Sequence, residues 1–453
     1  MNSGPLRVSG PLDLSGGKFP LGNRPFLLLW FGQAISQLGD RIHQIAVLWW
    51  SLQLRGNLGD AGWVMVATTL PAVLVSPLAG ALADRYNRRL IMLLGDFGRA
   101  ILVVILAVLA ATGGLNLPVL IATSLLLSVL GALFNPAAMA VVPELVPRNH
   151  LLKASSLQEI TLQSATLLGP PLGGLVVAAL NPSAAFFANS FSFLISALAI
   201  QAMGRSRRWH LISARPDEWW KLTRHGKQRN MVEEEQASVR RSTSELTIVA
   251  EGDETSRTSF WQELWDGVAI ASANRTIGML LVAFGLCNFF LAPIVLFLPR
   301  YATLFEVGPG GLGMLEGSLA LGMLVASLQL SFQPFASTPR WFYPLCLTGI
   351  GALLVALGML PIFWWFLIGL SGIGWALGAL NVTVVAYFQK TVPPDRMGRF
   401  MGLLMMVVFA TQPLGFALTG LLANTAHPGP LMTACGIGIF TIGTLLALFL
   451  PEH

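Results

Sequence analysis

Polar side chains recur near the start of the chain in a stretch that is otherwise apolar. At about 100° per residue they fall within about 60° of one another on one face of a helix. The stripe consists of Gln33, Gln37, Asp40 and Gln44. Arg41 and His43 flank it, so a buried Asp40 would have a cation and an imidazole within reach. Such a site can bind substrate or carry a proton. It can equally be a static ion pair that holds this helix to a neighbour.

Other acidic residues also fall in long apolar stretches, where an uncompensated charge costs roughly 2.5 to 3.5 kcal/mol. Asp96 and Arg99 are spaced i, i+3. This spacing favours a local ion pair, or a contact at a gate that closes one end of a substrate pathway, over a role in ion coupling. Glu159 is either part of a gate salt bridge or part of the substrate pathway. Glu316 has no basic residue in its own stretch, so burial would favour its protonated form. It is therefore a candidate for ion coupling, unless it lies near the outer mouth and is solvated.

Amide side chains in later apolar stretches either line a cavity or join helices by hydrogen bonds. They are Asn135, Asn288, Asn381 and Gln412. We assign Asn288 and Asn381 to the substrate pathway.

The residues expected of an enzyme are missing from the sequence. No serine or cysteine nucleophile accompanies Asp40 and His43 at a recognisable spacing. The three cysteines lie in separate apolar runs, which indicates neither disulfides nor a metal cluster. A G-x-x-x-x-G-K-[ST] phosphate loop is absent, so we expect no direct use of ATP. We expect no enzyme activity, no cofactor and no metal.

The composition places these polar residues in a membrane protein. The chain has 453 residues, of which 54% are hydrophobic and 11% charged. Soluble domains carry roughly 25% charged residues, and a membrane-spanning helix takes about 20 apolar residues. We therefore predict an all-α integral membrane protein with about a dozen spans. The net charge of +6 is explained by the placement of basic residues beside the membrane rather than by a nucleic-acid partner.

The apolar stretches divide into two groups of six. They lie near 25–52, 61–82, 90–111, 117–142, 154–180 and 183–203, then 276–303, 309–332, 342–360, 361–389, 400–425 and 428–450. We predict a cytoplasmic tail over 1–24, a six-helix bundle over 25–203, a linker over 204–275 and a second six-helix bundle over 276–453.

The linker is set apart by its charge. Residues 205–275 hold 12 of the Lys and Arg residues and 11 of the Asp and Glu residues, so they cannot lie in lipid. The part over 212–258 lacks apolar periodicity and is typical of a flexible tether, although a docking segment of a signalling or scaffold protein remains an alternative. Residues 260–275 predict an amphipathic helix that leads into the seventh span.

Basic residues in the short loops predict the orientation. One side, which includes both termini, carries 12 Lys and Arg residues outside the linker, and the other carries Arg55 and Arg300. Positive charge stays on the cytoplasmic side. We therefore expect a multi-pass protein of the cytoplasmic membrane with both termini and the linker in the cytoplasm. The first 20 residues contain no secretory signal.

The loop after the second stretch, G-A-L-A-D-R-Y-N-R-R from Gly80, resembles the signature loop of the major facilitator superfamily. Asn87 replaces the usual glycine, and we expect it to take a left-handed turn. The resemblance implies a fold of two six-helix pseudo-repeats. It also implies a cytoplasmic gate that latches the outward-open state. The gate residues would be Gly80, Asp84, Arg85, Arg88 and Arg89.

The fifth stretch resembles the G-P-x-x-G-G antiporter motif of exporters in this superfamily. The matching residues are Gly169, Pro170, Gly173 and Gly174. Glycine lets helices approach closely and proline opens a helix to bending, which suits a pivot between the halves. Pro171-Leu172-Gly173 recurs as Pro413-Leu414-Gly415 in the eleventh stretch, which favours two parallel repeats.

Further segments resemble the macrolide-efflux and enterobactin-exporter branch: G-Q-A-I-S-Q-L-G-D from Gly32, W-Q-E-L-W-D-G-V from Trp261 and V-P-P-D-R-M-G-R-F from Val392. We expect export of an amphiphilic small molecule by alternating access, with proton antiport as the driving force. The fourth stretch lacks the arginine of many proton-coupled exporters, so coupling must use Asp40 or another buried acid. Alternatives are a lysophospholipid flippase or another solute carrier. We expect membrane lipids as the only other partners, no nucleic acid, and a monomer.

Overall fold

The computed structural model describes residues 23–55, 58–146, 150–203, 260–331, 339, 341–393, 397–422 and 427–450. The expectations for the N-terminal tail up to residue 22 and for the linker over 212–258 lie outside the described residues. All statements below concern the described part of the chain.

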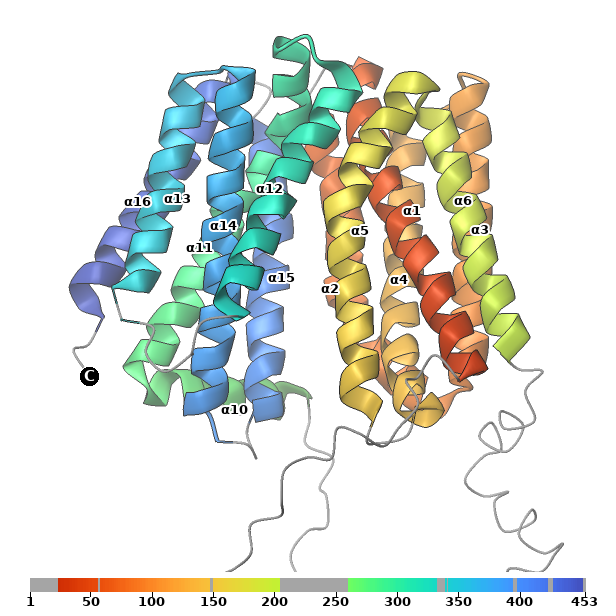
Figure 1. Ribbon diagram of the computed structural model, residues 1–453, viewed down its shortest axis with the longest axis horizontal. Helices are drawn as coiled ribbons and strands as arrows, with labels where there is room; N and C mark the ends of the chain where they lie inside the picture. Colours follow the sequence, from red (N-terminus) through yellow and green to blue (C-terminus); the bar gives the residue numbers. More distant parts are fainter. Residues whose placement is uncertain are drawn as a thin grey trace, which may run out of the picture.

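Twelve long helices form two bundles that stand side by side (Figure 1). The N-terminal bundle contains α1 (Arg24–Arg55), α2 (Leu58–Arg85), α3 (Arg88–Ala111), α4 (Leu117–Leu145), α5 (Leu151–Ala179) and α6 (Pro182–Met203). The C-terminal bundle contains α11 (Arg275–Leu304), α12 (Gly308–Ser331), α13 (Phe342–Met359), α14 (Phe363–Thr391), α15 (Met397–Leu422) and α16 (Pro428–Phe449). A shorter helix, α10 (Phe260–Ala273), precedes α11.

The helices confirm the predicted fold class. Within the described residues, 11 helices are long and apolar enough to cross a membrane. Helix α1 is the twelfth long helix; it is continuous over 32 residues, but the polar stripe around Asp40 interrupts its apolar sequence. An uninterrupted helix satisfies every backbone polar group internally, which lipid requires. The observed helix bounds lie within three residues of the predicted ones.

Side chains next to the helix starts explain where several helices begin. The side chains of Asn87, Asn116 and Asn274 accept hydrogen bonds from free backbone N–H groups at the starts of α3, α4 and α11. The expectation for Asn87 was therefore wrong. Its φ of −64° is not left-handed, and the residue is extended because it caps α3 through the backbone N–H groups of Arg89 and Leu90.

The two bundles have equivalent internal packing. In the N-terminal bundle α1 packs on α5, α2 on α4 and α3 on α6. In the C-terminal bundle the corresponding pairs are α11 with α15, α12 with α14 and α13 with α16. In this correspondence α2 is equivalent to α12 and α5 to α15. The contacts between the bundles are equivalent in the same way, since α5 packs on α12 and α15 packs on α2. This reciprocal pattern is what two pseudo-repeats related by a two-fold axis produce.

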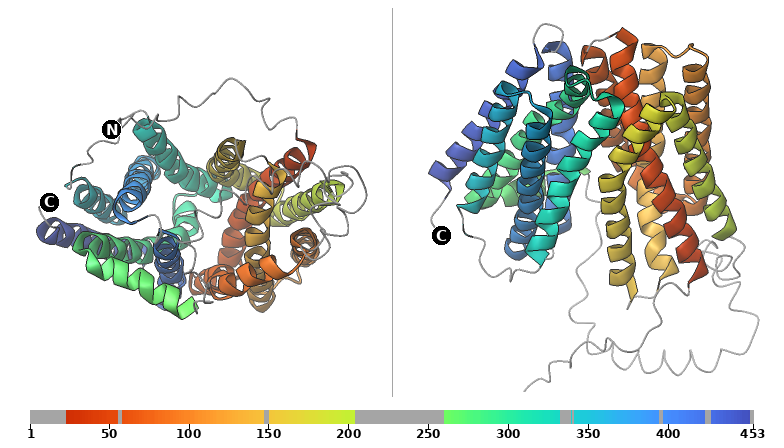
Figure 2. Two further views of the ribbon diagram at one scale, coloured as in Figure 1. Left: turned by 90° about the horizontal axis from the view of Figure 1, so that it is seen from below. Right: turned by 45° about the horizontal axis from the view of Figure 1, so that its top comes forward.

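The two ends of the molecule differ. We call the end where α6 finishes at Met203 and α10 begins the linker end, and the end where α1 finishes at Arg55 the distal end. The bundles lie together toward the distal end and diverge toward the linker end, as both side views show (Figures 1 and 2). Helix α10 lies across the linker end of the C-terminal bundle, packed on α11 and α15.

Candidate functional site

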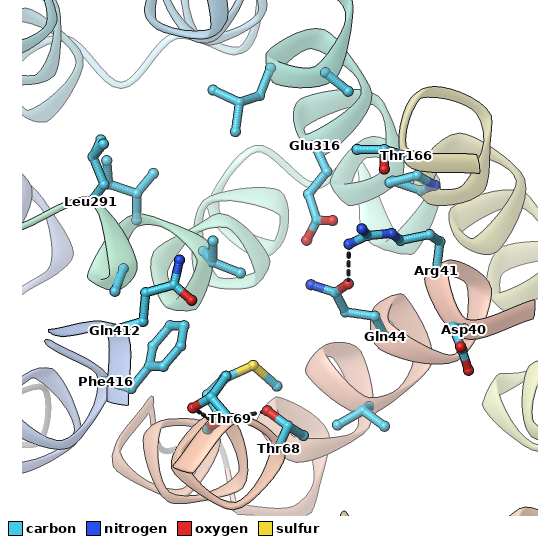
Figure 3. Close-up of a pocket in the computed structure, with 18 of the residues that line it drawn as sticks. Asp40, Arg41, Gln44, Thr68, Thr69, Thr166, Leu291, Glu316, Gln412 and Phe416 are labelled. Carbon is cyan, nitrogen blue, oxygen red and sulfur yellow. Dashed lines mark hydrogen bonds between the residues drawn. The ribbon is translucent and has the colours of Figure 1, made fainter. Parts of the chain in front are cut away.

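A large cavity lies between the two bundles at mid-height. Its volume is about 810 Å³, and it is lined by residues of α1 to α6 together with α11, α12, α14 and α15. A cavity of this size can hold a drug-sized molecule. Figure 3 shows part of the lining, with side chains from both bundles directed toward the same space.

Backbone contacts between the bundles close the cavity at the distal end. A Cβ atom on Gly62 of α2 would lie 2.7 Å from the Cα of Gly420 and 3.0 Å from the carbonyl oxygen of Phe416, both on α15. On the other side, a Cβ on Gly174 of α5 would lie 3.1 Å from the Cα of Gly313 on α12. These positions tolerate only glycine because the facing helix backbone occupies the space. We call these contacts the distal seal.

The antiporter-like motif contributes to this seal and also packs α5 on α1. Gly169 lies against the side chain of Arg41, and a Cβ on Gly173 would lie 3.0 Å from the Cα of Ile42. Pro170 and the neighbouring Pro171 contact glycines of α12, and Gly174 faces the same helix. The motif thus lies where α1, α5 and α12 meet. Its role as a pivot remains a prediction.

The walls of the cavity are chemically unlike. Of the 18 lining residues from the N-terminal bundle, 12 are polar or charged; of the 18 from the C-terminal bundle, only four are. The four are Asn288, Glu316, Asn381 and Gln412. The rest of the C-terminal wall is mainly aliphatic and aromatic. One wall can therefore bind polar groups while the other buries apolar surface.

The stripe on α1 divides between two environments. Gln33 accepts a hydrogen bond of 3.5 Å from Gln158 of α5, and Gln37 does not line the cavity. Asp40 lines the cavity and accepts a hydrogen bond of 3.4 Å from Asn189 of α6, so its carboxylate is held on the side of its own bundle. Gln44 lines the cavity and accepts a hydrogen bond of 3.3 Å from Arg41.

A buried ion pair lies behind Asp40 in the same bundle. Asp96 and Arg99 of α3 form the i, i+3 pair that the sequence suggested, and both are buried. The Arg99 guanidinium lies 4.4 Å from the ring centre of Phe134 and 4.5 Å from that of Phe193. Two aromatic faces can offset part of the cost of burying this cation. The pair connects α3 to α4 and α6 beside the cavity.

Arg41 and Glu316 face each other across the boundary between the bundles. Arg41 comes from α1 and Glu316 from α12, and Figure 3 shows their side chains directed toward one another at the edge of the cavity. Arg41 is close enough to act electrostatically on the Glu316 carboxylate. Oε1 of Glu316 is buried without a hydrogen-bond partner in the described part of the chain. This arrangement makes the charge of Glu316 sensitive to the relative position of the bundles.

The remaining pathway candidates differ in placement. His43 lines the cavity, and its ring centre lies 5.1 Å from that of Phe186. Asn288 and Asn381 also line the cavity, and Asn288 donates a hydrogen bond of 2.9 Å to the carbonyl of Phe284. Glu159 lies outside the lining and accepts a hydrogen bond of 2.8 Å from Gln163.

The predicted gate loop connects α2 and α3 at the linker end. Arg88 pairs with Glu144 of α4, and Arg89 donates to the carbonyls of Ile200 at 3.2 Å and Gln201 at 2.8 Å near the end of α6. Cations stabilise helix C-termini in this way. A Cβ on Gly80 would meet nothing within 4 Å. The side chains of Asp84 and Arg85 lie outside the described set. These contacts of Arg88 and Arg89 lie within the N-terminal bundle.

Asn189 and Ser192 of α6 were missed as site residues. The hydroxyl of Ser192 donates to the carbonyl of Asn189 at 2.7 Å, and Asn189 lines the cavity beside Asp40. The sequence does carry a signal for them. Asn189, Ser192 and Ser196 are spaced i, i+3 and i+7, which places a polar face on α6.

Comparison with known proteins gives evidence, independent of the site geometry, that the chain is similar to transporters. The family described as "Transmembrane secretion effector" matches residues 15–218. The multidrug efflux pump Tap of Mycolicibacterium fortuitum is 27% identical over 434 residues, which cover 94% of this chain and 96% of that protein. Macrolide efflux protein A of Streptococcus pyogenes is 23% identical over 404 residues, 88% of this chain and 89% of that protein.

Two further matches extend the comparison. The uncharacterized MFS-type transporter YfiS of Bacillus subtilis is 34% identical over 169 residues, which are 37% of this chain and 39% of that one. Among solved structures, a bacterial homologue of the iron transporter ferroportin in its inward-facing state has a TM-score of 0.67 at 16% identity. It covers 94% of this chain and 98% of that chain. The chain is therefore similar to multidrug- and macrolide-efflux transporters over nearly its whole length, and its fold is that of solved membrane transporters.

Proposed function

We propose that the chain exports an amphiphilic small molecule across the cytoplasmic membrane by alternating access. The observation that carries this proposal is the cavity of about 810 Å³ between the bundles, with one polar and one apolar wall. An amphiphile would place its polar groups on the N-terminal wall and its apolar body on the C-terminal wall. The efflux relatives that match nearly the whole chain support the direction of transport.

The distribution of basic residues supports a cytoplasmic location for the linker end. The distal seal would then face outward, and the conformation described above would be the one that receives substrate from the cytoplasm. Rocking of the bundles would break the contacts between Gly62 and α15 and between Gly174 and α12. The same motion would bring the gate arginines Arg88 and Arg89 toward the C-terminal bundle, where the superfamily's latch is expected.

We propose proton antiport as the driving force, with Glu316 as the coupling carboxyl. Arg41 and Glu316 belong to different bundles, so their separation must change when the bundles rock. The ionised carboxylate attracts Arg41 and stabilises the sealed distal end. Protonation removes that attraction, so it shifts the balance between the two conformations.

Asp40 has a different part in this scheme. Its hydrogen-bond partner Asn189 and its cationic neighbour Arg99 belong to the same bundle and move with it. Protonation of Asp40 therefore acts on substrate binding in the cavity, or passes the proton onward, rather than directly on the contact between bundles. We assign Asp40 to the substrate and proton pathway and Glu316 to the switch.

A strain comparison tests the proposed function. A deletion strain and its parent are compared for susceptibility to macrolides and cationic dyes and for exported metabolites, each with and without a protonophore. We expect the deletion strain to accumulate at least one amphiphile, and the protonophore to abolish the difference. Equal accumulation in both strains for every compound would contradict export. Lipid movement in proteoliposomes without movement of any such compound would favour the flippase.

A further inference from the structure

A second hollow lies on the outer surface of the C-terminal bundle, between α11 and α16. Its volume is about 310 Å³, and only apolar residues and one glycine line it. Val282 and Leu286 of α11 and Leu445 and Phe449 of α16 form the exposed walls, with Val282 59% and Phe449 55% exposed. Leu446, which is only 3% exposed, lies at the floor. We call this hollow the lateral groove.

The lateral groove is separate from the transport cavity. The cavity is lined by Phe284, Cys287 and Asn288 of α11, whereas the groove is lined by Val282 and Leu286 of the same helix. At about 100° per residue, Val282 and Phe284 project to opposite sides of α11. The groove therefore opens toward the lipid that surrounds two membrane-spanning helices, and hydrocarbon is the medium that can fill it.

A cation stands at one mouth of the groove. Arg275 is the first residue of α11, is exposed, and lies on the same helical face as Gly278 and Val282. It is therefore about one turn nearer the linker end than the first groove residue. An arginine at the end of a membrane-spanning helix extends its guanidinium to the level of the lipid headgroups.

Helix α10 marks the headgroup level at the same mouth. A Cβ on Gly278 would lie 2.8 Å from the carbonyl oxygen of Ala271, so the end of α10 packs directly on the first turns of α11. Trp265 of α10 is 68% exposed, and tryptophan favours the interface between membrane and water. The apolar groove therefore ends where the membrane interface begins.

We propose that the lateral groove binds one acyl chain of an anionic phospholipid, whose phosphate lies against Arg275. The groove supplies apolar burial along Val282, Leu286 and Phe449, and Arg275 supplies the charge that selects an anionic headgroup. The site holds a structural lipid next to α10, at the end of the chain's polar linker.

Native mass spectrometry of the full-length protein in detergent tests the site. The probes are palmitoyl-oleoyl phosphatidylglycerol and the matching phosphatidylcholine, each added over a range of concentrations. We expect the unmodified protein to retain one phosphatidylglycerol molecule in preference to phosphatidylcholine. Val282→Trp should lower the retention of both lipids roughly tenfold, because the indole takes the space of about two methylene groups of the chain.

Two further variants separate the parts of the site. Arg275→Gln should abolish the preference for phosphatidylglycerol while phosphatidylcholine retention stays unchanged. Leu345→Trp is the matched control, because Leu345 lies on α13 and is 56% exposed. It should retain lipid as the unmodified protein does. Equal retention by Val282→Trp and Leu345→Trp would overturn the groove, and an unchanged preference in Arg275→Gln would overturn the headgroup contact.

Discussion

The substitution Gly62→Ala should shift the transporter away from the conformation described here. A Cβ on Gly62 would lie 2.7 Å from the Gly420 Cα, 3.0 Å from the Phe416 carbonyl oxygen and 3.2 Å from the Gly420 nitrogen. All three are backbone atoms of α15, so no side chain can move aside to relieve the overlap. Overpacking of this kind costs about 1 to 3 kcal/mol.

The cost applies to the sealed distal end alone, because outward opening separates α2 from α15. A difference of about 1 to 3 kcal/mol changes an equilibrium by roughly 5- to 150-fold. We therefore expect Gly62→Ala to raise the ratio of distally open to distally sealed molecules by a factor in that range. The helix propensity gained by replacing glycine with alanine is the same in both conformations and does not affect this ratio.

Spin labels at Thr112 and Met359 measure the shift. These exposed residues lie at the distal ends of α3 and α13, one in each bundle. Pulsed electron paramagnetic resonance should show a longer-distance population growing in Gly62→Ala. Gly349→Ala is the control, because a Cβ there meets nothing within 4 Å. Identical distance distributions in Gly62→Ala and Gly349→Ala would refute the assignment of Gly62 to a conformation-specific seal.

Three further predictions concern other parts of the molecule. Asp40→Asn should abolish efflux while the yield of folded protein stays normal, because asparagine can keep the hydrogen bond to Asn189 but cannot exchange a proton; normal efflux would remove Asp40 from the mechanism. Arg99→Met should destabilise the purified protein by about 3 to 5 kcal/mol in denaturant unfolding, because it leaves Asp96 buried without its partner; a change within error would contradict a net stabilising role of this ion pair. Deletion of 212–258 should leave efflux intact in the strain assay, and loss of efflux from a well-expressed variant would favour the docking segment.

The fold could be predicted from the sequence because its determinants are local. Each span is a long apolar run, and the break at Tyr86 and Asn87 and the turn near Pro361 interrupt the pattern where the helices end. Repeated contacts between α5 and α12 and between α15 and α2 follow from two similar halves related by an axis.

The arrangement of the site could be predicted less completely from the sequence. The spacing on α1 gave the polar face, but it could not tell which neighbour each side chain would meet. Asp40 turns to Asn189 in α6, whereas Arg41 turns to Glu316, which is 275 residues later in the chain. The rotation of one helix against another depends on packing that no single helix encodes. Asn87 was misjudged because both a left-handed turn and a helix cap favour asparagine.

Proton-coupled transport in proteoliposomes tests the central claim most directly, with the compound to which the deletion strain is most sensitive as substrate. An acidic lumen should drive wild-type protein to accumulate this compound while the lumen becomes alkaline. Glu316→Gln should lose this gradient-driven accumulation, yet it should still exchange external for internal substrate, because exchange requires no proton release. Accumulation by Glu316→Gln at the wild-type rate, with lumenal alkalinisation, would contradict the account.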